Sequence, residues 1–132
     1  MYAANAYKQY QRTQITSANQ KTLIIMLYGG AIKFINEAKV KLQKNDIAGK
    51  GKAIGRAMNI VNELLSSLDF QKGGEVAGKL SNLYFHVNQQ LTEANFSNQI
   101  KNLDHVLNVL TTLKDAWEKV PFKELKELKG SQ

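Results

Sequence analysis

The sequence predicts an all-α protein, an antiparallel up-down-up-down four-helix bundle that follows an N-terminal arm. Three observations predict this fold class. Apolar residues recur at the spacing of one helical face along four stretches of the chain. The chain has a single proline, Pro121, so most of its length has no forced helix break. The connections between the four stretches are short, which favours antiparallel neighbours.

The first predicted helix runs from about residue 19 to residue 44, with Ser17 or Asn19 as its N-cap. Asn45-Asp46 then interrupts the apolar pattern. Because an aspartate accepts hydrogen bonds from the first free N–H groups of a helix, Asp46 can cap a second helix that ends near Asp69.

Gly73-Gly74 is the clearest break in the chain, and a third helix is expected over residues 75–94 with its glutamate at the positive end of the helix dipole. Residues 95–98 form a short turn. A fourth helix then runs to about Lys119, where Pro121 stops it.

We expect a single domain over residues 1–132. It comprises an arm over residues 1–18, a bundle over residues 19–120 and a tail over residues 121–132. The arm could be mobile or could cap the bundle. The tail could form a further short amphipathic helix or fray. No internal repeat or linker divides the chain.

Positive charge is concentrated in the first half of the chain, whose overall net charge is +7. Residues 1–56 hold ten Lys or Arg against two acids, whereas residues 57–132 hold eight against nine. This half is either a solvated face or a surface for nucleic acid or another acidic partner. Because 16 of the 18 cations are lysines spaced singly, we expect no nucleic-acid binding and keep it as the alternative function.

The sequence carries no pattern typical of an enzyme, metal site or cofactor site. It has no cysteine, and its two histidines, His86 and His105, stand singly on different predicted helices. Gly73-Gly74 lacks the Gly-Lys-Ser/Thr that completes a phosphate loop. We therefore predict a protein that is not an enzyme and needs no metal or cofactor.

Nothing in the sequence predicts export or membrane insertion. The first residues lack the basic-then-apolar order of a signal peptide. The longest apolar run, residues 23–28, is far shorter than the roughly 20 residues that span a bilayer. Together with the lack of cysteine, this favours the cytosol.

The predicted helices carry more apolar residues than one core needs. Ile25 and Ile32 lie almost opposite the core stripe of the first helix, and Phe85 points away from the core stripe of the third. The second helix has an apolar shoulder that widens its arc to roughly 160°, beyond the roughly 100° of a surface helix. The shoulder consists of Ala53, Ala57, Ile60 and Leu64.

These flanks predict a surface that binds an amphipathic helix, because a contiguous exposed apolar surface usually marks a partner site. The alternative is that loops or the N-terminal arm cover them. Ile47 and Val76 are assigned to the core stripes.

Gly29-Gly30, inside the first helix, allows either close packing on a neighbouring helix or the approach of another backbone.

Several blocks of the sequence, in order and spacing, resemble the FliS family of flagellar secretion chaperones. The resemblance extends over residues 7–117. The blocks are Met26-Leu27-Tyr28 with Gly30, Phe34 and Ala38; Ile54, Arg56, Ala57 and Glu63-Leu64; Gly73-Gly74-Glu75-Val76-Ala77; Leu83-Tyr84, Leu91 and Ala94-Asn95; and Leu113-Lys114-Asp115-Ala116-Trp117. In two places the sequence departs from the family pattern: Asn19-Gln20 stands where a proline is usual, and Phe85 stands where an acidic residue is usual.

The resemblance implies a cytosolic export chaperone that binds the C-terminal helical region of flagellin. Such a chaperone masks an apolar stripe that would otherwise polymerise prematurely, and helps to deliver the client to a component of the flagellar export gate. Some members also bind regulators such as the anti-sigma factor, and self-association through the same surfaces stays open. In empty members the arm can cover the client site, a role that here would fall to Tyr7 and Tyr10, with Ile15 as a further candidate. The alternative is an arm that only anchors the N-terminus.

The predicted partner-binding residues combine the periodicity with the resemblance. The client helices are expected to dock on six residues of the first two helices, with Tyr7 and Tyr10 displaced or docked again. The six are Ile25, Ile32, Ala53, Ala57, Ile60 and Leu64.

Overall fold

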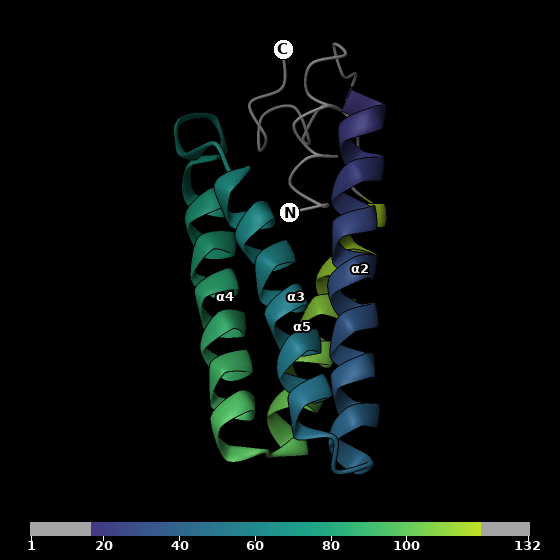
Figure 1. The fold of residues 1–132 in the computed structure, drawn as a ribbon. Coiled ribbons are helices and arrows are strands. Elements are labelled where there is room, and N and C mark those ends of the chain that lie inside the picture. Colours follow the sequence, from purple (N-terminus) through teal and green to yellow (C-terminus); the bar gives the residue numbers. More distant parts are fainter. Residues whose placement is uncertain (1–16, 120–132) are drawn as a thin grey trace.

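The structure is a computed structural model that describes residues 17–119. This part of the chain forms four helices: α2 (Ser17–Gln43), α3 (Ile47–Ser66), α4 (Phe70–Ser97) and α5 (Ile100–Glu118). The helices run alternately up and down, and each packs on two others: α2 on α3 and α5, and α4 on the same two (Figure 1). The predicted antiparallel four-helix bundle is thereby confirmed. The predicted arm through residue 16, with Tyr7 and Tyr10, and the predicted tail lie outside the described residues.

Helix α2 begins slightly earlier than the sequence predicts. Both Ser17 and Asn19 are helical, so neither is the N-cap. The turn after α2 agrees with the prediction. Asn45 has a φ of 63°, a left-handed conformation that asparagine tolerates, and Asp46 follows it as the N-cap of α3. The Oδ1 atom of Asp46 accepts the backbone N–H of Gly49 at 2.9 Å.

Helix α4 also begins earlier than expected. Asp69 is the N-cap of α4 and not the last residue of α3, because its Oδ1 atom accepts the backbone N–H groups of Gln71 and Lys72, both at 3.0 Å. The predicted break is a kink inside α4, where Gly74 adopts φ 52° and ψ −126°. A side chain would be strained in this conformation, which explains the glycine.

The core lies along the bundle axis and draws apolar side chains from all four helices. Two polar contacts that join different helices are buried with it. The hydroxyl of Tyr28 contacts Tyr84 and Trp117 near the centre. The Lys50 ammonium donates to the backbone oxygen of Asn95 at 2.8 Å and to Oδ1 of Asn98 at 2.5 Å, and so satisfies acceptors at the C-terminal end of α4.

Candidate partner-binding surface

The apolar shoulder predicted on α3 is not exposed. Its members Ala53, Ala57, Ile60 and Leu64 are all buried in the core. The prediction of an exposed shoulder was wrong because α3 packs against two neighbours, α2 and α4, and therefore needs a wider apolar arc than a helix that covers a core from one side.

The paired glycines of α2 lie against two different helices. A Cβ atom on Gly30 would stand 3.1 Å from Cδ1 of Ile60, so this glycine allows α2 and α3 to pack closely. A Cβ atom on Gly29 would stand at an ordinary 3.8 Å from Cε of Lys114 in α5. Of the two roles left open by the sequence, close helix packing is the one that Gly30 has.

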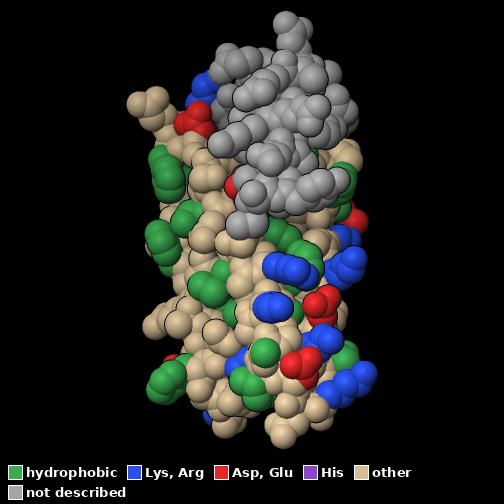
Figure 2. Space-filling model, viewed as in Figure 1, with side chains coloured by type: hydrophobic (Ala, Val, Ile, Leu, Met, Phe, Trp, Pro, Cys, Tyr) green, Lys and Arg blue, Asp and Glu red, His purple; other side chains and the backbone are tan. Residues whose placement is uncertain are grey.

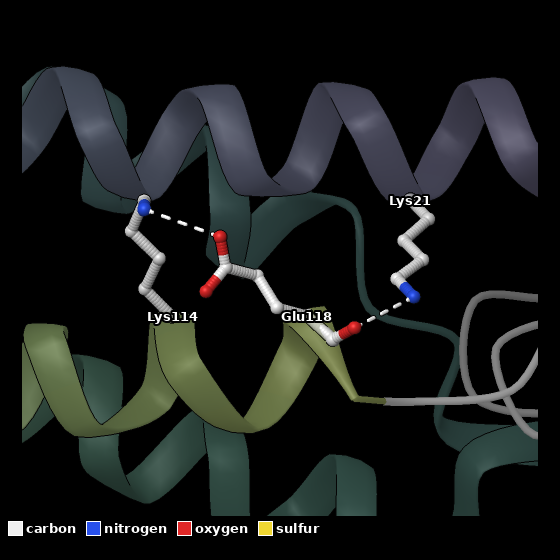
Figure 3. Close-up of polar contacts among 3 residues, drawn as sticks. All are labelled: Lys21, Lys114 and Glu118. Atoms are coloured by element: carbon white, nitrogen blue, oxygen red, sulfur yellow. Dashed lines mark hydrogen bonds and ion pairs between the residues drawn. The ribbon is translucent and has the colours of Figure 1, made fainter.

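Ile25 and Ile32 are half-buried beside α5. They share a helical stripe with Gly29, which faces Lys114 of α5, and the same stripe begins at Lys21. The Lys21 ammonium donates to the backbone oxygen of Glu118 at 2.9 Å (Figure 3). Further along the α2–α5 contact, Lys39 pairs with Asp104 at 2.5 Å. The two isoleucines pack against the core and expose only part of their surface, so the prediction that they lie almost opposite the core was wrong.

The large apolar side chains that are exposed lie mostly on α4. Seven stand out among the described residues: Met26 and Val40 of α2, Ile47 of α3, and Phe70, Val76, Phe85 and Phe96 of α4. Apolar side chains also recur along the edge of the molecule that α4 forms (Figure 2). The assignment of Ile47 and Val76 to the core was wrong. Both lie close to where their helices begin, near the ends of the bundle, where fewer neighbours cover a side chain.

One stripe of α4 runs alongside α3. Within it, Nδ2 of Asn88 donates to Oδ1 of Asn62 at 2.9 Å, and Oγ1 of Thr92 lies 4.0 Å from Sδ of Met58. Residues three or four apart share a helical face, so Phe85 and Phe96 continue the same stripe on either side of these two contacts. Phe85 is 59% exposed and Phe96 is 87% exposed.

The facing stripe of α3 is apolar on either side of Asn62. Met58 and Leu65 are half-buried there and pack against the core, and Gly55 is exposed, with no atom within 4 Å of the place where its Cβ would stand. We call Gly55, Met58, Leu65, Phe85 and Phe96 together the α3–α4 surface. It offers two aromatic side chains beside a stretch of α3 that another backbone can approach closely.

Positive charge lies beside this surface rather than within it. Helix α4 carries two lysines and two glutamates, whereas α3 carries three cations and one acid. Lys52 and Arg56 are exposed on α3, and the Arg56 guanidinium lies 5.8 Å from the ring centre of Phe34 in α2. Lysine and arginine side chains accordingly appear over α2 and α3 in Figure 2 and are sparse along the α4 edge.

The described residues bring together no cage of three or more metal ligands. Within residues 17–119 no three His, Cys, Asp or Glu side chains converge as metal ligands. No helix in that range has the length and apolar character needed to cross a membrane. The α3–α4 surface itself offers apolar contact with a basic border.

Only part of the α3–α4 surface was predicted from the sequence. The sequence pattern identifies Phe85 as pointing away from the core, whereas Phe96 was missed. Phe96 follows Phe85 by eleven residues, close to three full helical turns, so the two aromatic residues share a face. This spacing could have identified the α4 stripe.

Comparison with known proteins gives matches over nearly the whole chain. Residues 3–124 match the model of the family described as flagellar protein FliS. The chain is 38% identical to the flagellar secretion chaperone FliSB of Pseudomonas aeruginosa, over 89% of this chain and 97% of that protein. It is 34% identical to the flagellar secretion chaperone FliS of Salmonella typhimurium, over 93% and 95%. It is 30% identical to the protein of the same name from Bacillus subtilis, over 99% and 97%.

Proposed function

The chain belongs to the family of the flagellar protein FliS, and from this premise we propose that it binds the C-terminal helical region of flagellin in the cytosol before export. The family consists of flagellar secretion chaperones, so the chain is an export chaperone and not an enzyme. The binding of flagellin, its site and its delivery are the parts that we propose.

The observation that carries the proposal is the apolar surface left on a closed bundle. Phe85 and Phe96 are exposed although the core is complete without them. Burying a large apolar side chain contributes roughly 1.5–3 kcal/mol to the free energy of binding. An amphipathic helix that covers both rings and the neighbouring Met58 therefore gains several kcal/mol, from which the cost of ordering that helix is subtracted.

A client helix would lie along the contact between α3 and α4. Its apolar face would contact the aromatic rings, and its backbone would approach α3 at Gly55, where no side chain intervenes. The exposed Lys52 and Arg56 would border the site and suit acidic residues on the polar face of the client. The same contacts would hide the client's apolar stripe and so prevent premature polymerisation.

We retain part of the site predicted from the sequence. Ile25 and Ile32 could form a second, smaller contact at the edge between α2 and α5. Ala53, Ala57, Ile60 and Leu64 support the bundle from within and are not included. Tyr7 and Tyr10 stay predicted as a lid over the client site.

The same surface would serve the delivery and the release of the client. The bound client would be delivered to a component of the export gate, and its release would require only that its apolar contacts with the chaperone be replaced by other contacts. Anti-sigma factor binding by some family members makes a regulator a further partner. A second copy of the chain could occupy the surface when no client is present.

Calorimetric titration of the full chain with a peptide of the flagellin C-terminal region tests the function. Binding with a negative heat-capacity change that depends weakly on salt supports apolar docking. Binding that weakens steeply as salt rises would favour the alternative, an acidic or nucleic-acid partner on the lysine-rich half. No heat of binding, with the protein folded, would refute the proposal.

A further inference from the structure

The two histidines of the chain meet across the contact between α4 and α5. Nε2 of His86 lies 2.8 Å from Nε2 of His105, and their rings are nearly perpendicular, at 88° with centres 5.0 Å apart. His86 is half-exposed and His105 is exposed. The pair lies on the flank of α4 that faces α5, away from the α3–α4 surface. One turn further along, Nδ2 of Asn102 donates to Oε1 of Gln90 at 2.8 Å across the same two helices.

The proposed function leaves this pair unused. A hydrogen bond between two exposed groups adds little stability, because water satisfies both groups when they separate. The arrangement nevertheless brings two imidazole nitrogens together at a place that solvent can reach. Imidazole nitrogen is a ligand for zinc, nickel, copper and iron ions.

We propose that His86 and His105 form a two-imidazole site for a divalent late transition-metal ion that places two ligands at a right angle, such as Ni²⁺ or Cu²⁺. Two metal–nitrogen bonds of roughly 2.0–2.1 Å at a right angle separate the nitrogens by about 2.9 Å. The same bonds at a tetrahedral angle separate them by about 3.4 Å. The observed 2.8 Å matches the right-angle separation, and the two rings would turn from pointing at each other to pointing at the ion.

Binding also requires a change in the protonation of the imidazoles. In the hydrogen-bonded pair one Nε2 carries the shared proton, so that ring must shift its proton to Nδ1 before both Nε2 lone pairs can face the metal. No net proton is released by this shift. Water completes the coordination, because no third His, Cys, Asp or Glu converges on the pair within the described residues.

A bound ion would join α4 to α5. The two histidines are 19 residues apart, and the ion would close this segment into a loop. Metal binding should therefore stabilise the folded bundle by mass action, since the unfolded chain does not hold the two rings together.

Titration of the tag-free full chain with NiCl₂ at neutral pH tests the proposal. The chain contains no cysteine and no other histidine, so no competing strong ligand set is present. We expect one ion per chain and a thermal midpoint that rises with Ni²⁺ but not with Mg²⁺. His105→Gln and His86→Gln should each weaken binding by on the order of tenfold or more, because each leaves a single imidazole.

Asn102→Ala is the matched control, because it removes a polar contact between the same two helices and leaves both imidazoles. Its Ni²⁺ affinity should equal that of the unsubstituted chain. If His86→Gln does not fold, the exposed His105→Gln decides the question. No binding of Ni²⁺ or Cu²⁺, or binding that survives the loss of His105, would overturn the proposal.

Discussion

The hydroxyl oxygens of Tyr28 in α2 and Tyr84 in α4 lie 2.5 Å apart inside the bundle, and the Nε1–H group of Trp117 in α5 donates to the Tyr28 oxygen at 3.1 Å. The contact joins two helices that stand diagonally opposite in the bundle. The three side chains are large and mostly apolar, and each hydrogen-bonds through its one polar group to another of the three. The core therefore gains a specific arrangement as well as buried apolar area.

Removing the two hydroxyls one at a time should have unequal effects. Tyr84→Phe leaves Tyr28 still bonded to Trp117, so we expect the free energy of unfolding to fall by about 1–2 kcal/mol. Tyr28→Phe leaves both Tyr84 and the Trp117 N–H without this partner, and the loss should be about 2–4 kcal/mol. Urea unfolding of both variants measures the difference. Equal losses would contradict a network centred on Tyr28.

The same tyrosines predict a loss of stability at alkaline pH. Burial raises the pKa of Tyr28 to about 12, although hydrogen bonds from Tyr84 and Trp117 oppose the shift. Burial, reinforced by the charge and hydrogen bond of Tyr28, raises the pKa of Tyr84 as well. Because both folded-state pKa values exceed the unfolded value of 10.0, the stabilisation is complete below pH 10 and is lost as the pH rises toward 12.

The alkaline loss should approach about 1.4 kcal/mol per pH unit for each tyrosine. Tyr84→Phe should therefore unfold less steeply with pH above 10 than the unsubstituted chain, in urea titrations at a series of pH values. Every other side chain is the same in both proteins, so the comparison isolates the Tyr84 hydroxyl. Parallel pH profiles would show that the buried hydroxyls do not resist ionisation.

Gly29 and Gly30 form a matched pair for helix packing. Alanine at Gly29 meets only ordinary contact with Lys114, so Gly29→Ala should stabilise the bundle by about 0.5–1 kcal/mol through helix propensity. Alanine at Gly30 gains the same propensity but crowds Cδ1 of Ile60, so Gly30→Ala should bring no net gain. The urea midpoints of the two variants decide. Equal stabilisation by both would mean that α2 and α3 can separate freely at this point.

Lys50 should stabilise the end of α4 rather than bind a partner. Lys50→Met keeps the aliphatic stem but leaves the Asn95 and Asn98 oxygens without their donor, and should reduce the free energy of unfolding by about 1–3 kcal/mol. Lys52→Met, on the exposed side of α3, should change it by less than about 0.5 kcal/mol. A Lys50→Met protein as stable as the Lys52→Met control would contradict this role.

Much of the fold could be predicted from local features. The helix number, the antiparallel order and the Asp46 cap depend on apolar spacing and on residues within one turn, and these are visible in the sequence. Asp69 was assigned to the wrong helix, because a helix end and an N-cap both use a short polar residue and only the Gln71 and Lys72 N–H groups distinguish them.

The binding surface was harder to predict because exposure depends on the neighbours of each helix. When α3 is considered alone, Ile60 lies outside the core stripe and is predicted to be exposed. The close approach of α2 at Gly30 buries it. Val76 reads as core, but it lies too near the end of the bundle to be covered. Phe85 was recognisable because its position conflicts with the stripe of its own helix, and that conflict needs no knowledge of neighbours.

The affinity for a flagellin C-terminal peptide in a variant with Phe85→Ser and Phe96→Ser tests most directly whether the α3–α4 surface binds the client. Both rings are exposed, so the variant should fold as well as the unsubstituted chain. Its affinity in calorimetry should fall on the order of 100-fold, about tenfold for each ring. A matched variant with Met26→Ser and Val40→Ser, which removes exposed apolar side chains from α2, should keep its affinity. Unchanged binding by the folded Phe85 and Phe96 variant would contradict the account.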